Sequence, residues 1–110
     1  MIEVNIKFEE HTDKLVCKIN GDFDAYHSAE IKKLIKEKME NSKTNKIVID
    51  MSNVPYIDSA GLGAMVAVLK DARNLGRELV LMALRQNVKR IFEMTRLDKV
   101  FKIVDVLEEA

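Results

Sequence analysis

The sequence predicts a single α/β domain over residues 1–110, with a mixed β-sheet of about four to five strands, an N-terminal β-hairpin and about four helices. The length of 110 residues suits one hydrophobic core and is too short for two. Apolar residues first alternate with polar ones, and later apolar runs of strand length are separated by stretches with helical spacing. Such a succession of strands and helices is typical of α/β domains.

The composition excludes several classes of function. The 18 basic and 18 acidic residues cancel, so we expect no general attraction to nucleic acid or to an anionic membrane. The single cysteine, Cys17, excludes an internal disulfide and a cysteine-based zinc site, and we expect no metal or other cofactor. The first residues lack the pattern of a secretory signal, and no apolar run is long enough to span a bilayer. The protein is therefore expected to be cytoplasmic.

Two alternating segments predict the hairpin, and the apolar positions are Ile2, Val4, Ile6 and Phe8 in the first and Leu15, Cys17 and Ile19 in the second. The polar segment 9–14 between them is short enough for a hairpin loop. It places His11 at the loop tip, where a solvated histidine is expected rather than a ligand. Cys17 is expected to be a buried structural thiol.

A helix follows the strand break at residues 21–24, with the apolar positions Ala29, Ile31, Leu34, Ile35 and Met39, and should end between Asn41 and Asn45. Its lysines alternate with glutamates, so we interpret its polar face as solvated surface. The runs 47–49 and 79–83 lack alternation, which predicts strands covered on both faces in a three-layer domain. A third helix around Val88 to Thr95 and an edge strand within 100–104 complete the expected fold.

The helix expected from Ala60 to Leu75 carries more apolar residues than one buried stripe requires. Since an outer helix of a small domain is not fully enclosed, we interpret the excess as a surface for a partner. Gly61 and Gly63 lie in its first turns, where each costs about 0.5–1 kcal/mol relative to alanine. Close approach of another backbone or of a partner would offset that cost.

Asp58 and Ser59 precede this helix, and either side chain could cap it. A serine presented at the positive end of the helix dipole would also suit a phosphate. Local chemistry alone leaves both roles open.

The run from Asp50 to Gly63, DMSNVPYIDSAGLG, resembles the signature of the STAS domain, the module of anti-sigma factor antagonists and of the cytoplasmic tails of sulfate transporters. In the antagonists the serine of the Asp-Ser-x-Gly-Leu-Gly motif is phosphorylated, which implies phosphorylation at Ser59. The segment 21–24 resembles the one that precedes the first STAS helix, and it places Asp24 on the family's aspartate. Arg96 stands where the family commonly has glycine after the third helix. Glycine favours the left-handed backbone that often ends a helix, so the sequence does not predict whether this helix ends in that way.

The resemblance implies a free-standing anti-sigma factor antagonist that is not an enzyme. The unphosphorylated form would bind an anti-sigma factor with serine kinase activity and release the sigma factor, and phosphorylation would end the binding. ATP and magnesium would belong to that kinase, and a serine phosphatase would reset the switch. The expected partner-binding residues are Asp24, Asp58, Ser59, Gly61, Leu62, Gly63 and Met65.

Three other functions compete with this interpretation. A serine hydrolase would use Ser59 as nucleophile and His27 as base, but Ile57 stands where a Gly-x-Ser-x-Gly motif needs glycine. A phospho-aspartate receiver would use Asp22 and Asp24 to hold magnesium and Asp50 as the phosphoryl acceptor, but no lysine follows the strand at 79–83. The main alternative is a STAS interaction module in a signalling complex that does not act on a sigma factor.

Overall fold

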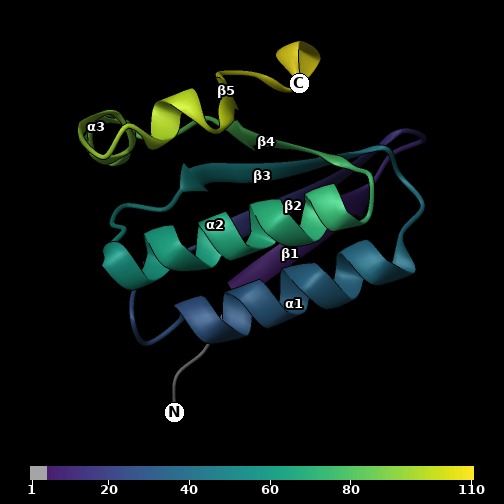
Figure 1. The fold of residues 1–110 in the computed structure, drawn as a ribbon, viewed down its shortest axis with the longest axis horizontal. Coiled ribbons are helices and arrows are strands. Elements are labelled where there is room, and N and C mark those ends of the chain that lie inside the picture. The colour runs from purple at the N-terminus through teal and green to yellow at the C-terminus, as the bar shows by residue number, and fades with distance from the viewer. Residues whose placement is uncertain (1–4) are drawn as a thin grey trace.

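A computed structural model describes residues 5–110 as a mixed sheet (Figure 1), and the three α-helices pack on one face of it. The strands are β1 Asn5–Glu10, β2 Lys14–Asn20, β3 Lys46–Asn53, β4 Glu78–Met82 and β5 Lys102–Val104. The α-helices are α1 Ser28–Asn41, α2 Ser59–Asn74 and α3 Gln86–Met94, followed by the short 3-10 helices η1 Leu97–Lys99 and η2 Leu107–Glu109. The predicted fold class is confirmed, with three α-helices rather than about four in this part of the chain.

The strand order is β1-β2-β3-β4-β5, so each new strand is added beside the previous one. β1 and β2 are antiparallel and form the predicted hairpin, whereas β2 to β5 are parallel. Positions 2 and 4 of the first expected strand lie outside the described residues. One α-helix connects each parallel strand to the next, and every connection advances across the sheet in the same direction. Since such connections are right-handed, all three α-helices lie on the same face of the sheet. The domain has two layers, and the expectation of three layers was wrong.

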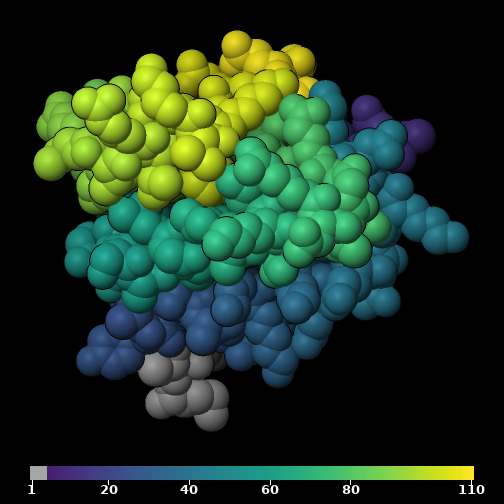
Figure 2. Space-filling view, viewed as in Figure 1, coloured from purple at the N-terminus to yellow at the C-terminus, as the bar shows by residue number. Residues whose placement is uncertain are grey.

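The core lies between this helical layer and the sheet. The buried side chains from β2 and β3, including Leu15, Cys17 and Ile49, meet Ile35 of α1 and Val68 of α2. Figure 2 shows α1, α2 and the chain after β4 covering this face of the molecule. Burial raises the pKa of the Cys17 thiol to about 12, although the nearby Lys38 lowers it slightly. The expectation of a buried structural thiol is confirmed.

The other face of the sheet is covered only in part, by the C-terminal segment. Val48 of β3 and Val80 of β4 pack against Ala110 there. The ammonium group of Lys46 donates to the carbonyl of Ala110 at 3.0 Å, which fastens the segment to β3. The two strands are therefore covered on both faces as their composition predicts, but one turn of chain provides the second cover.

Arg96 ends the α3 region with a left-handed backbone, at φ 62° and ψ 16°. Its N–H donates to the carbonyl of Glu93 at 3.1 Å, so the turn closes as it would with glycine. A left-handed conformation costs an L-residue roughly 1–2 kcal/mol, which glycine would avoid. The residue that ends the α3 region is therefore left-handed although it is arginine and not glycine.

Candidate functional site

Two loops meet at the carboxyl ends of β2 and β3, where residues 21–27 lead into α1 and residues 54–58 lead into α2. In Figure 1 this is the end of the molecule at which both helices begin. The backbone of Phe23 joins the loops, since its N–H donates to Tyr56 at 2.9 Å and its carbonyl accepts from Asp58 at 3.3 Å. Phe23 and Ile57 form a parallel bridge. Adjacent parallel strands deliver their loops to one edge of the sheet, as the sequence analysis expects.

Asp58 is the N-cap of α2 and also holds the two loops together. Its Oδ1 accepts from the N–H of Gly61 at 2.9 Å, which satisfies a donor of the first helical turn. Its Oδ2 accepts from the N–H of Ala25 at 3.0 Å. Both oxygens of the carboxylate are therefore committed to internal bonds that fix the start of α2 against the other loop.

Because Asp58 caps α2, the hydroxyl of Ser59 is free of that role. Ser59 is the first residue of the helix and its side chain is exposed. Within residues 5–110 its Oγ makes no hydrogen bond. The question left open by the sequence is answered by position: the aspartate is the cap, and the serine is presented to solvent at the positive end of the helix.

Asp24 shapes the loop before α1. Its Oδ1 accepts from the N–H groups of Tyr26 and His27, each at 3.1 Å, and lies 2.7 Å from Nδ1 of His27. Partial desolvation raises the pKa of Asp24, but the hydrogen bonds and positive charge of His27 and the N–H of Tyr26 outweigh it and lower that pKa below its usual value. The carboxylate is thus ionised at neutral pH, on the loop that Asp58 holds against the start of α2.

The glycines of α2 have different surroundings. A Cβ at Gly61 would lie 2.1 Å from the carbonyl oxygen of Phe23 and 2.8 Å from a side-chain carbon of Ile57. Gly61 is buried, and its small size allows the two loops to approach each other. A Cβ at Gly63 would meet nothing within 4 Å, and this position is exposed.

Leu62 is half-buried, whereas Met65 is completely buried in the core. Met65 was expected among the partner-binding residues, but the helix turns its side chain toward the sheet and away from the surface. The excess apolar residues of α2 mostly pack inward against the sheet and α1.

The family model described as STAS domain matches residues 5–110. The chain belongs to the STAS domain family. A relative from Listeria monocytogenes, an anti-sigma-B factor antagonist, is 34% identical over 105 residues, which are 96% of this chain and 90% of the relative.

Solved structures agree with this assignment. The crystal structure of tm1081 from Thermotoga maritima matches with a TM-score of 0.87 and 28% identity, over 94% of this chain and 89% of that one. The anti-sigma factor antagonist SpoIIAA in its unphosphorylated form matches with a TM-score of 0.70 and 16% identity, over 96% of this chain and 92% of that one. The phosphorylated Bacillus SpoIIAA matches with a TM-score of 0.71 and 16% identity, over 96% of this chain and 95% of that one. Both SpoIIAA forms thus share the fold of this STAS domain.

Two tyrosines at the site were missed by the sequence analysis. Tyr26 lies on the loop before α1 and is 76% exposed, and Tyr56 lies on the loop before α2 and is 50% exposed. They are the only tyrosines of the chain, which has no tryptophan. Their position on the two loops that precede the helices of this STAS domain was a signal that could have revealed them.

The geometry does not assemble a hydrolase. His27 pairs with Asp24, and the described residues include no hydrogen bond between His27 and Ser59. An activated serine needs a base within hydrogen-bonding reach that a third group orients. In the described residues the imidazole of His27 is thus bonded to Asp24 and not to Ser59.

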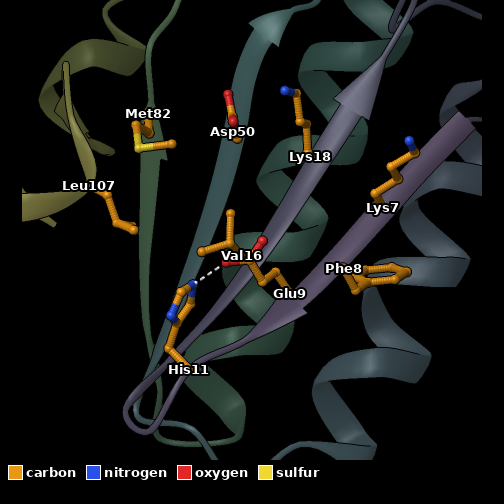
Figure 3. Close-up of a pocket in the computed structure, with 9 residues that line it drawn as sticks. All are labelled: Lys7, Phe8, Glu9, His11, Val16, Lys18, Asp50, Met82 and Leu107. Carbon is orange, nitrogen blue, oxygen red and sulfur yellow. Dashed lines mark ion pairs between the residues drawn. The ribbon is translucent and has the colours of Figure 1, made fainter.

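Asp50, the acceptor that a receiver would need, points to the opposite face of the sheet. There it helps to line a hollow of about 400 Å³ together with Lys18, Val16 and Met82 (Figure 3). Its Oδ1 accepts from the N–H of Ser52 at 2.9 Å.

Within residues 5–110 no three histidine, cysteine, aspartate or glutamate side chains are arranged to hold a metal ion. The helices of this same part of the chain are each too short or too polar to cross a bilayer.

Proposed function

We propose that this STAS domain is an anti-sigma factor antagonist that is controlled by phosphorylation at Ser59. The unphosphorylated form binds an anti-sigma factor that is also a serine kinase, and the sigma factor is released. Phosphorylation of Ser59 ends the binding, and a serine phosphatase restores it. The observation that carries this proposal is the exposed, unbonded hydroxyl of Ser59 at the start of α2, within the family's signature.

The arrangement around Ser59 supports the role of a kinase substrate. The hydroxyl is accessible, while Asp58 and the backbone of Phe23 hold the surrounding loops in place. A phosphate at a helix N-terminus is favoured by the helix dipole, so the domain can carry the modification. ATP and magnesium belong to the partner kinase, the chain performs no catalysis, and the exchange takes place in the cytoplasm.

The expected partner-binding residues differ in how far their side chains are buried. Asp24, Asp58, Ser59, Leu62 and Gly63 present at least part of their surface to solvent, so they form the proposed contact region. Gly61 and Met65 are buried and support this region from beneath.

Phosphorylation of the wild-type chain is expected at Ser59 alone, and Ser59→Ala is expected to remove it. The chain is incubated with ATP and each anti-sigma factor kinase of its own genome, and phosphorylated residues are mapped by mass spectrometry. Ser28→Ala is the matched control, because Ser28 begins α1 as Ser59 begins α2 but is only 8% exposed. Wild-type levels of phosphate on Ser59→Ala would contradict the assignment.

Gly63→Val is expected to weaken binding of the anti-sigma factor about tenfold, since added bulk in a packed contact costs roughly 1–3 kcal/mol. The fold should persist, because a Cβ at Gly63 meets nothing within 4 Å. Lys70→Val, at an exposed position two helical turns further along α2, serves as control and should bind normally. Affinities are measured by calorimetry. Equal affinities for Gly63→Val and the wild type would remove Gly63 from the interface.

A further inference from the structure

In the described residues the phenylalanines pack into the core, whereas the tyrosines are exposed to solvent. Phe23, Phe92 and Phe101 are at most 4% exposed, and Phe8 packs against the same core. Tyr26 and Tyr56, by contrast, are 76% and 50% exposed. Both tyrosines lie on the two loops that Asp58 and Phe23 join beside Ser59. The exposed aromatic side chains of the described residues thus both belong to the loops at the Ser59 end of the domain.

The backbones that carry the two rings are held in place. The carbonyl of Tyr56 accepts from the N–H of Phe23 at 2.9 Å, and the carbonyl of Pro55 accepts from the side-chain amide of Asn87 at 2.8 Å. The N–H of Tyr26 donates to Asp24 at 3.1 Å. Little backbone ordering is therefore needed when the rings are covered by a partner, which favours binding.

We propose that Tyr26 and Tyr56 are the aromatic anchors by which the anti-sigma factor grips the Ser59 end of the domain, an inference that rests on the proposed function. A tyrosine offers a large apolar ring of few rotamers and a hydroxyl that can bond at the wet edge of a contact. Such residues are enriched among the few that dominate binding energy at protein interfaces. The partner should present an apolar recess for each ring, next to the surface that covers Ser59.

The test uses the anti-sigma factor kinase that phosphorylates the wild-type chain. Tyr26→Ala and Tyr56→Ala should each lower the affinity of the unphosphorylated chain about 10- to 30-fold in calorimetry. Met94→Ala is the matched control, because Met94 is 79% exposed at the last residue of α3, outside both loops in the sequence, and it should bind as the wild type does. Melting temperatures of all variants should match that of the wild type.

Steady-state phosphorylation provides a second readout. If the rings contribute binding that is the same in the ground state and the transition state, the tyrosine variants raise KM for the chain about tenfold and leave kcat unchanged. A fall in kcat with unchanged KM would overturn the inference, because it would place the rings in the phosphoryl-transfer step rather than in docking.

The failures of the two proposals are distinguishable. Wild-type affinity in folded Tyr26→Ala and Tyr56→Ala, with Ser59 still phosphorylated, would overturn the anchors and leave the proposed function intact. A loss of self-association in these variants, with kinase affinity unchanged, would also overturn the inference, because the rings would then join two copies of the chain. Failure of the wild-type chain to bind any anti-sigma factor would overturn both proposals.

Discussion

Phosphorylation of Ser59 is expected to leave the folded domain almost unchanged while it removes partner binding. The phosphate adds about −1.5 to −2 charges at neutral pH, next to the carboxylate of Asp58. That carboxylate repels it, whereas the helix N-terminus attracts it by typically 0.3–1 kcal/mol. These local effects oppose each other. The isolated domain should therefore lose little stability.

The expected structural result is a set of amide chemical-shift changes confined to the first turn of α2 and the loops 21–27 and 54–58, with a melting temperature within a few degrees of the unmodified value. Ser59→Ala treated with the same kinase and ATP is the control. Shift changes spread through β4, α3 and β5, or a large fall in melting temperature, would contradict a local electrostatic switch and would indicate a conformational one.

Gly61→Ala is expected to destabilise the domain by about 3 kcal/mol, at the upper end of the usual cost of overpacking. The reason is that the new Cβ would lie 2.1 Å from the carbonyl oxygen of Phe23, and a backbone atom in the joined loops cannot move aside as a flexible side chain can. In a domain of this size that loss lowers the melting temperature by roughly 10–20 °C.

Gly63→Ala is the matched control for this effect. The position is exposed, helical and free of neighbours within 4 Å, so alanine should stabilise the domain by about 0.5–1 kcal/mol through its higher helix propensity. Chemical denaturation of the two variants gives the comparison. Similar stabilities for Gly61→Ala and Gly63→Ala would contradict the assigned role of Gly61 as the place where the loops make close contact.

Local patterns in the sequence predicted most of the elements and the position of the site. The alternation around Cys17 and the helical spacing from Ile31 to Met39 located the hairpin and α1, because both periods depend only on which side of an element is buried. The first helix ends at Asn41, the first residue of the predicted range Asn41 to Asn45, and both ends of α2 were predicted to within one residue. The meeting of the loops before α1 and α2 followed from the order of parallel strands.

The features that sequence analysis missed depend on contacts between distant segments. The apolar runs in β3 and β4 require cover on both faces, but they do not show that Ala110 and the C-terminal turn provide it. The need for glycine at position 61 comes from the carbonyl of Phe23, which is far away in sequence. Met65 belongs to an apolar helix on which more than one face could have been turned outward, and only packing against the sheet decided its burial.

The central claim is that a phosphate on Ser59 acts as an off-switch for the partner. Burying an unpaired dianion in a contact costs several kcal/mol, and each 1.4 kcal/mol is a tenfold loss of affinity. The most direct measurement titrates the anti-sigma factor with fully phosphorylated and with unmodified chain in the same calorimetry buffer. We predict that phosphorylation weakens the affinity by about 100-fold or more, and equal affinities of the two forms would contradict the account.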